Sequence, residues 1–441
     1  MLKFISNNKL LFIAIHIVIG YLVTFSFFPK IFGAAVLILG IVIIFISKNQ
    51  NEEALFVSGY IIGVEVFLRM IKGFISYETG KYGIALFLIM GMIFGPTKQK
   101  NGIIYIFYLM LLLLGIVFTQ VPEGESIRKA IVFNLAGPIS LGICALYLYK
   151  RPISFSELTE LLYFILLPIF SMVTFMYFRT PDLREYVFGT SSNFSTSGDF
   201  GPNQVATILG FGIFVLGVFL YLKNKITGFL ILDAVLLAYF TYRGFLTFSR
   251  GGVITAGVAF ISLSILLIIY RKGSLISIIK YLGVSCFFIV GIWLYTSDIT
   301  GGMIDNRYIG KDASGKNKDI STGRADIFTN QLESFKDAPV FGIGVGNGKF
   351  KRELEGKKVA TSHNEVSRLI EEHGLIGVII LLILIIVPLF HFAYSNNFQR
   401  AFIIAFFLFW FLTINHSAMR IAFPSFIYAL SLIRITNDDS K

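Results

Sequence analysis

The sequence predicts an all-α fold, a bundle of helices that crosses a membrane many times. Its 441 residues are 55% hydrophobic and only 15% charged, with a mean hydropathy of +0.76, whereas soluble domains carry about 25% charged residues. Phe supplies 47 residues and Tyr another 20, which suits lipid-facing surfaces and interfacial belts. We therefore expect membrane lipids, rather than water, to surround most of the chain.

Long apolar runs define the expected spans. A bilayer core of about 30 Å needs about 20 apolar residues per helix, and about fourteen runs qualify. The runs near Leu39, Phe87 and Phe426 are short or closely spaced, so about twelve spans is the alternative. Either even count places both termini on one side. The run over residues 10–28 lacks a cleavage site and should remain as an anchor. The other centres are Ile19, Ile62, Met110, Leu141, Leu166, Phe214, Leu236, Ile261, Phe287, Leu384 and Phe406.

The basic residues of the short loops predict the orientation. Lys and Arg close to a span prefer the cytoplasm, so the side that carries them, which is also the side of the N-terminus, should be cytoplasmic. The net charge of +12 is scattered between apolar runs, which argues against a nucleic-acid partner. The basic residues of these loops are Lys48, Lys98, Lys100, Lys150, Arg151, Lys223, Lys225, Arg271, Lys272 and Arg400.

This topology divides the chain into three parts. Residues 1–296 form the first eleven spans, residues 297–372 form an extracytoplasmic loop, and residues 373–441 form the last three spans. A polar segment of this length with patterned apolar residues is usually functional. In it we expect an amphipathic helix over 324–336 and a second helix that starts after a Ser362 cap and runs into the next span.

The Gly-rich stretch FGIGVGNG at 341–348 allows two interpretations. A nucleotide-binding loop is one, but no Lys-Ser/Thr pair follows and no parallel strand precedes it. The other is a turn, which we favour. The two cysteines, Cys144 and Cys286, lie in apolar runs without CxxC spacing, so the sequence indicates neither a metal site nor a disulfide framework.

Two arginines and a histidine on the outer side are the expected reactive residues. Arg250 lies in LTFSRGG at the start of a span, Arg324 in STGRADI, and His363 in TSHNE. A guanidinium beside a helix start is suited to phosphate, and imidazole can take a proton near neutral pH. Each residue alone has an ordinary alternative, a snorkelling arginine or a solvated histidine. Together they provide the phosphate ligands and the base that glycosyl transfer from a lipid diphosphate needs.

Other polar residues are assigned supporting roles. Arg243, about two helical turns before Arg250, is a candidate third phosphate ligand, and Tyr242 is expected to stack on sugar. Glu65 and Arg69 are four residues apart on one helix and should pair with each other. The residues expected at the support or acceptor side are Asn203, Tyr242, Asn364, Glu372, His373, His416 and Arg420.

The order of several short motifs resembles the O-antigen ligase and O-antigen polymerase superfamily. The resemblance covers about the C-terminal half of the chain, and no single motif is decisive. The motifs are PNQVA at 202–206, LTFSRGG at 246–252, GRADI at 323–327, DAPVFGIGVGNGKF at 337–350, SHNE at 362–365 and EEHGLIG at 371–377.

The resemblance implies a GT-C-like membrane bundle in the bacterial inner membrane, with an active site that faces the periplasm or cell exterior. It implies transfer of a glycan from undecaprenyl diphosphate to an acceptor such as lipid A core, without metal or cofactor. Arg250 and Arg324 would hold the diphosphate and His363 would activate the acceptor hydroxyl. Phe328 and Val366 stand where the family often has Trp and an aromatic or bulky residue, so the acceptor contacts should differ.

Several activities fit the same site. A ligase transfers the glycan to lipid A core, a polymerase of O-antigen, capsule or exopolysaccharide transfers it to another lipid-linked glycan, and a protein O-oligosaccharyltransferase uses Ser or Thr. A multispanning polysaccharide transporter or lipid flippase is the rival from another class. A transporter should carry ionisable residues near the bilayer midplane or show inverted repeats. The sequence shows few such residues and no internal repeat.

Overall fold

A computed structural model describes residues 8–96, 101–270, 275–319, 323–357 and 362–436. Lys98, Lys100, Arg271 and Lys272, used above for orientation, lie outside these residues. The chain is a helix bundle, and the described part contains only one small parallel sheet, in which β1 (Pro152–Ser154) pairs with β2 (Arg434–Thr436). The predicted all-α membrane fold is confirmed.

Within the described residues, seven helices are long and apolar enough to cross a membrane. An eighth candidate span is broken, because α12 (Leu275–Ile299) bends by 117° into the short helix α13 (Met303–Ile309). The seven are α3 (Phe28–Ser47), α7 (Ile127–Leu148), α8 (Phe155–Arg179), α9 (Pro202–Tyr221), α11 (Arg250–Tyr270), α16 (Glu365–Ala393) and α17 (Asn397–His416).

The expected span count of about 12–14 is larger than this number, although every predicted centre falls within a helix. The helix α18 (Phe423–Leu430) has only 8 residues, which is about 12 Å of helix and too short to span. The helix α4 (Glu53–Met70) is buried along almost its whole length and carries three charges. The other apolar helices are α2 (Lys9–Leu22), α5 (Thr79–Phe94), α6 (Ile103–Val117) and α10 (Leu230–Leu246).

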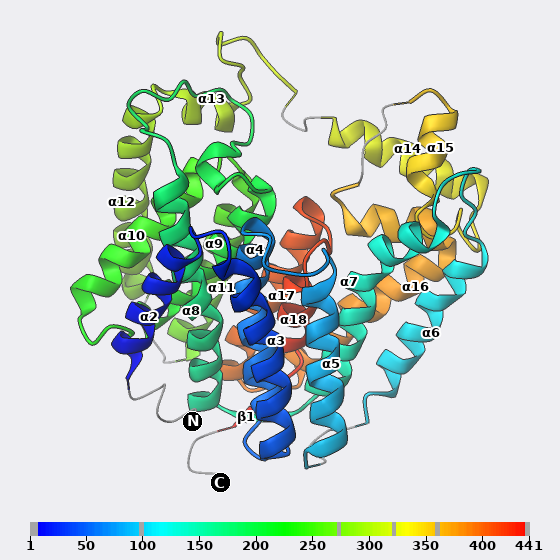
Figure 1. The fold of residues 1–441 in the computed structure, drawn as a ribbon, viewed down its shortest axis with the longest axis horizontal. Coiled ribbons are helices and arrows are strands. Elements are labelled where there is room, and N and C mark those ends of the chain that lie inside the picture. The colour runs from blue at the N-terminus through cyan, green and yellow to red at the C-terminus, as the bar shows by residue number, and fades with distance from the viewer. Residues whose placement is uncertain (1–7, 97–100, 271–274, 320–322, 358–361, 437–441) are drawn as a thin grey trace.

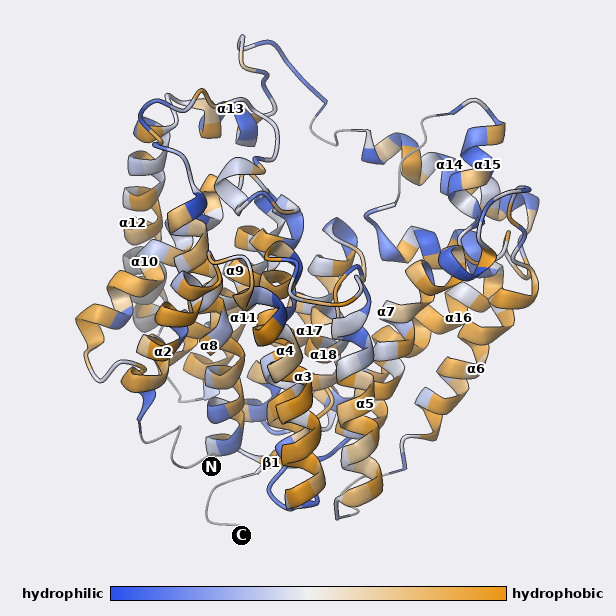
Figure 2. Cartoon of the chain, in the orientation of Figure 1, coloured by the Kyte–Doolittle hydropathy of each residue, from blue (hydrophilic) through white to orange (hydrophobic). Residues whose placement is uncertain are grey.

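The two ends of the bundle differ in character. The start of α2 and the β1–β2 pair lie towards one end of the bundle, and α13, α14 (Arg324–Asp337) and α15 (Asn347–Leu354) lie at the other (Figure 1). Apolar residues dominate the body of the bundle, whereas hydrophilic residues gather around these three helices (Figure 2). The loop helix predicted over 324–336 is confirmed, while α15 was not predicted.

Close helix packing fixes the centre of the bundle. A Cβ atom on Gly252 of α11 would lie 1.9 Å from the carbonyl oxygen of Ala206 in α9, and one on Gly210 would lie 2.3 Å from the oxygen of Gly252. Only glycine allows these two backbones to approach so closely. The start of α11 is consequently held close against α9.

A sharp bend joins the outer loop to the bundle. Within α16, Gly374 has a left-handed backbone, φ 61° and ψ −138°, which a residue with a Cβ rarely adopts. The segment 339–346 packs against this bend, with Ile343 N donating to Glu371 O at 3.0 Å and Leu375 N to Pro339 O at 2.7 Å. Gly342, Gly344 and Gly346 also have positive φ, so the Gly-rich stretch forms turns, as predicted.

Candidate functional site

Three arginines converge on one cavity at the outer-loop end of the bundle. Arg250 at the start of α11, Arg307 in α13 and Arg324 at the start of α14 line a cavity of about 380 Å³. Arg250 and Arg324 are therefore brought together, as the sequence predicts. The described cavity wall contains no Asp or Glu; its polar remainder is Asn203, Ser249, Thr255, Asn415 and His416.

The sequence around Arg250 explains its placement. Ser249 Oγ donates to Asn203 Oδ1 at 2.8 Å, which ties the start of α11 to the start of α9. A Cβ atom on Gly251 would meet the His416 ring at 2.3 Å, so this glycine lets α17 approach. Arg250 is the first residue of α11, and the positive dipole end of a helix favours an anion.

Sequence reasoning missed Arg307. Its Nε donates to Phe248 O at 3.1 Å and its Nη2 to Ser192 Oγ at 3.3 Å. These bonds hold its guanidinium over the segment that precedes Arg250. The only sequence signal was a basic residue in the outer loop, because the 117° bend between α12 and α13, which returns it to the cavity, is a tertiary feature.

The described wall of the cavity is positively charged, with three arginines and no carboxylate among its residues. Partial burial, and then the charge of Arg250, lower the pKa of Arg324, since neighbouring cations oppose each other's ionised form. An anion entering the cavity would relieve this repulsion. Planar guanidinium groups bind phosphate oxygens through paired N–H donors, so a phosphate or diphosphate suits the site.

A polar turn places His363 beside this cavity. Asn364 Oδ1 accepts from Ser367 N at 3.1 Å and thereby caps α16, while Asn364 Nδ2 donates to Asn415 Oδ1 at 3.1 Å. The predicted cap, Ser362, is wrong; its hydroxyl instead accepts from Asn364 N at 3.1 Å. Arg420 Nη2 donates to Ser362 O at 2.9 Å. Both chain neighbours of His363 are therefore held in place, Ser362 by Arg420 and Asn364 by Asn415 of the cavity wall.

The His363 imidazole is neutral near pH 7. Burial, with the charges of Arg324 and Arg420, lowers its pKa to about 4, below the ordinary value of about 6.5. Among the described residues it has no hydrogen-bond partner. A neutral imidazole has a free lone pair, which is the form required of a general base.

The loop between α17 and α18 is held by the buried ion pair of Glu65 and Arg69. Arg69 Nη2 lies 2.5 Å from Glu65 Oε1, which confirms the predicted pairing. The remaining atoms of the pair reach further: Arg69 Nη1 donates to Arg420 O at 3.0 Å, and Ala422 N donates to Glu65 Oε2 at 2.7 Å. Arg69 Nη1 also donates to Gln204 Oε1 at 3.3 Å, next to Asn203. The pair therefore positions two parts of the site.

Arg243 and Tyr242 lie apart from the cavity. Arg243 is buried, and its Nη2 donates to Thr180 Oγ1 at 2.7 Å and to Thr196 O at 3.0 Å. These partners tie α10 to α8 and to the 3₁₀ turn Ser195–Ser197. The ring of Tyr242 packs against Tyr295, with centroids 5.5 Å apart. Neither side chain lines the cavity, because both are engaged in packing of the bundle.

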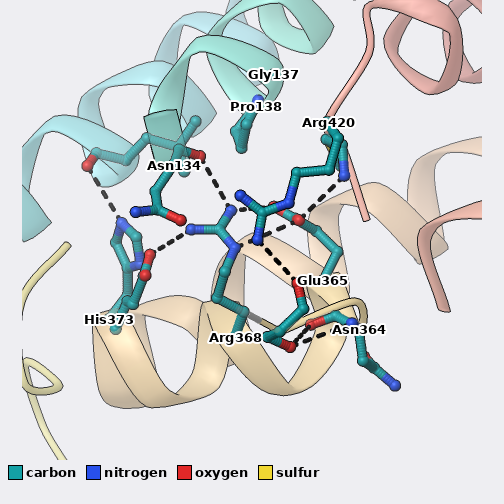
Figure 3. Close-up of polar contacts among 12 residues, drawn as sticks. Asn134, Gly137, Pro138, Asn364, Glu365, Arg368, His373 and Arg420 are labelled. Atoms are coloured by element: carbon teal, nitrogen blue, oxygen red, sulfur yellow. Dashed lines mark hydrogen bonds and ion pairs between the residues drawn. The ribbon is translucent and has the colours of Figure 1, made fainter. Parts of the chain in front are cut away.

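Glu372 and His373 are buried in α16 beside Arg368, and Figure 3 shows Arg368 with Glu365 and His373 near Asn134 of α7. Arg368 forms ion pairs with Glu365 and Glu372, and donates to Asn134 O at 3.1 Å. His373 Nε2 lies 3.3 Å from Leu112 O. The spacing of the acids, three residues before and four after Arg368, was a readable signal for these ion pairs, which the sequence analysis did not use.

Comparison with known proteins agrees with this geometry. Residues 234–382 match a family model described as O-antigen ligase, and this segment contains Arg250, Arg307, Arg324 and His363. No curated protein matches the chain. The chain is therefore a multi-pass membrane protein in which residues 234–382 are similar to the O-antigen ligase family.

Proposed function

We propose that this protein is a membrane glycosyltransferase that moves a glycan from undecaprenyl diphosphate to an acceptor hydroxyl. The observation that carries the proposal is a cavity with three arginines and no described carboxylate, beside a histidine that is neutral near pH 7. The cationic wall matches a diphosphate, and the histidine matches a hydroxyl that must lose a proton.

The donor diphosphate occupies the cavity in this proposal. Arg250 and Arg324 bind its oxygens with paired N–H donors, and Arg307 adds a third positive charge. The start of α11 contributes backbone amides. Because these groups surround the place where the leaving group gains charge, they stabilise the transition state more than the ground state. The polyprenyl tail extends into the membrane.

The reaction is a single displacement with inversion at the anomeric carbon. His363 takes the proton of the acceptor hydroxyl while its oxygen bonds to that carbon. The bond from the carbon to the diphosphate oxygen breaks, and undecaprenyl diphosphate leaves. The arginines hold the departing negative charge, so the leaving group needs no proton. The site would face the periplasm or the cell exterior, where such donors and acceptors meet.

The test uses purified full-length protein in lipid nanodiscs with an undecaprenyl-diphosphate-linked glycan. Separate reactions contain lipid A core, a second lipid-linked glycan, or a Ser/Thr peptide as acceptor, which distinguishes ligase, polymerase and protein glycosylation. Arg250→Ala, Arg324→Ala and His363→Ala should each abolish transfer, whereas the exposed control Lys336→Ala should not. Movement of intact donor across a sealed vesicle, with no transfer to any acceptor, would favour a transporter and overturn the proposal.

A further inference from the structure

A second pocket lies on the opposite side of the His363 turn from the arginine cavity. It has a volume of about 320 Å³ and shares no wall residue with the cavity. Its walls come from the start of α7, from α15 with the turn before it, and from Ser362 and Arg420. Ser362 lines this pocket and Asn364 is bonded to Asn415 of the cavity, so the chain passes from one space to the other at His363.

The charged side chains on the floor of this pocket neutralise one another in ion pairs. Arg352 Nη1 lies 3.0 Å from Glu371 Oε1, and Arg368 is paired with Glu372. Gln331 Nε2 donates to Glu371 Oε2 at 2.8 Å. These groups are buried, and a buried charge that lacks its partner is strongly destabilising. The floor is therefore a fixed framework with its charges already matched, and a ligand's charge must be met at the rim.

The rim is cationic and partly aromatic. Lys129 and Lys349 are exposed, and Glu125 is the one described carboxylate of the wall outside the buried framework. The Arg420 guanidinium lies over the Phe133 ring, 4.2 Å from its centroid. Apart from the bond to Ser362 O, its N–H donors have no hydrogen-bond partner among the described residues. Cations beside an aromatic face suit a sugar that carries an acidic group.

We propose that this second pocket binds the acceptor, and that the acceptor is an anionic glycan whose sugars carry phosphate or carboxylate groups. The inference rests on the proposed transferase activity. The acceptor would lie against Lys129, Lys349 and Arg420, with its hydroxyl at the Ser362–Asn364 turn. The donor diphosphate would lie in the arginine cavity, so that His363 stands between the two substrates.

Calorimetric titration of the full-length protein in nanodiscs tests this assignment. The probes are maltohexaose, phosphorylated maltohexaose and hexagalacturonate, which are neutral, phosphorylated and carboxylated. We expect an acidic probe to bind about tenfold more tightly than the neutral one, and Lys129→Gln/Lys349→Gln to remove that preference. The tighter of the two acidic probes identifies the acidic group. The control Lys318→Gln/Lys336→Gln removes the same charge from exposed positions of the loop and should bind as the unaltered protein does.

Two results would overturn the inference: equal binding of neutral and acidic probes, or an unchanged preference in Lys129→Gln/Lys349→Gln. A parallel titration with undecaprenyl diphosphate separates this failure from failure of the proposed function. If only the acceptor inference fails, undecaprenyl diphosphate still binds, and Arg250→Ala weakens this binding. If the proposed function fails, undecaprenyl diphosphate does not bind to the unaltered protein. A protein that binds the acidic probe but not undecaprenyl diphosphate would then overturn the assignment of this pocket to the acceptor. In a transfer assay the double variant should raise the acceptor KM by roughly tenfold at unchanged donor affinity.

Discussion

Replacement of Arg324 by Gln is expected to separate binding from stability. In the free protein Arg324 faces Arg250 across a cavity without a described carboxylate, so its loss relieves repulsion. Because the group is only partly buried, solvent screening limits the gain to less than about 1 kcal/mol. The thermal midpoint of Arg324→Gln should therefore be unchanged or slightly higher than that of the unaltered protein.

Donor binding should change in the opposite direction. A hydrogen bond to a charged partner contributes about 1.5–3 kcal/mol. Since Arg250 and Arg307 remain in place, we expect a loss near the lower end, about 1.5–2 kcal/mol. That loss corresponds to roughly 10- to 30-fold weaker binding of undecaprenyl diphosphate. Titration of the donor lipid into nanodisc-embedded protein measures it, and Lys336→Gln, in the same helix, is the charge-matched control.

Two outcomes would refute this reasoning. If Arg324→Gln bound the donor lipid as tightly as Lys336→Gln, the guanidinium would not contact the diphosphate. If affinity fell together with a thermal midpoint several degrees lower, Arg324 would support the fold rather than the ligand. A diphosphate site requires weaker binding without loss of stability.

Four further predictions address the other groups of the site and the bundle. His363→Ala should lower the transfer rate by about 10²- to 10⁴-fold and leave affinity for undecaprenyl diphosphate in titration unchanged; a large loss of donor affinity would contradict its role as base. Because bound diphosphate offsets the charge of Arg324, it should raise the pKa of His363 from about 4, so donor affinity should increase as pH falls from about 6.5 towards 4, and His363→Ala should remove this slope. Gly252→Ala should destabilise the protein by about 1–3 kcal/mol in thermal unfolding, because the new Cβ would lie 1.9 Å from Ala206 O; Gly257→Ala, with no atom within 4 Å of its Cβ, should not. EDTA treatment should leave the transfer rate unchanged if arginines supply the positive charge, and a loss restored by added Mg²⁺ would contradict this.

The local elements of the fold were predictable from the sequence. Apolar runs located every helix of the bundle because the hydrocarbon core imposes a long uniform pattern. The amphipathic pattern after Gly323 gave α14, which spans Arg324–Asp337. The expected 12–14 spans exceed the seven described helices that are long and apolar enough to span, because helix length depends on packing: α18 is apolar yet only 8 residues long.

The position of a candidate site residue was predictable where that residue starts a helix. Arg250 and Arg324 each begin a helix, and the topology placed both at the same end. Arg307 was missed because its position depends on the bend after α12. Arg243 was assigned to the diphosphate, but its guanidinium is bonded to Thr180 and Thr196. Which face of α10 turns inward is decided by α8, and the spacing of two arginines along the chain does not reveal it.

The most direct test of the account is the structure of the full-length protein in a nanodisc with undecaprenyl diphosphate, determined by electron cryomicroscopy. The account predicts both phosphate groups within hydrogen-bond distance of Arg250 and Arg324, with the His363 turn beside them. Phosphates bound elsewhere on the protein, with the arginine cavity empty, would contradict it.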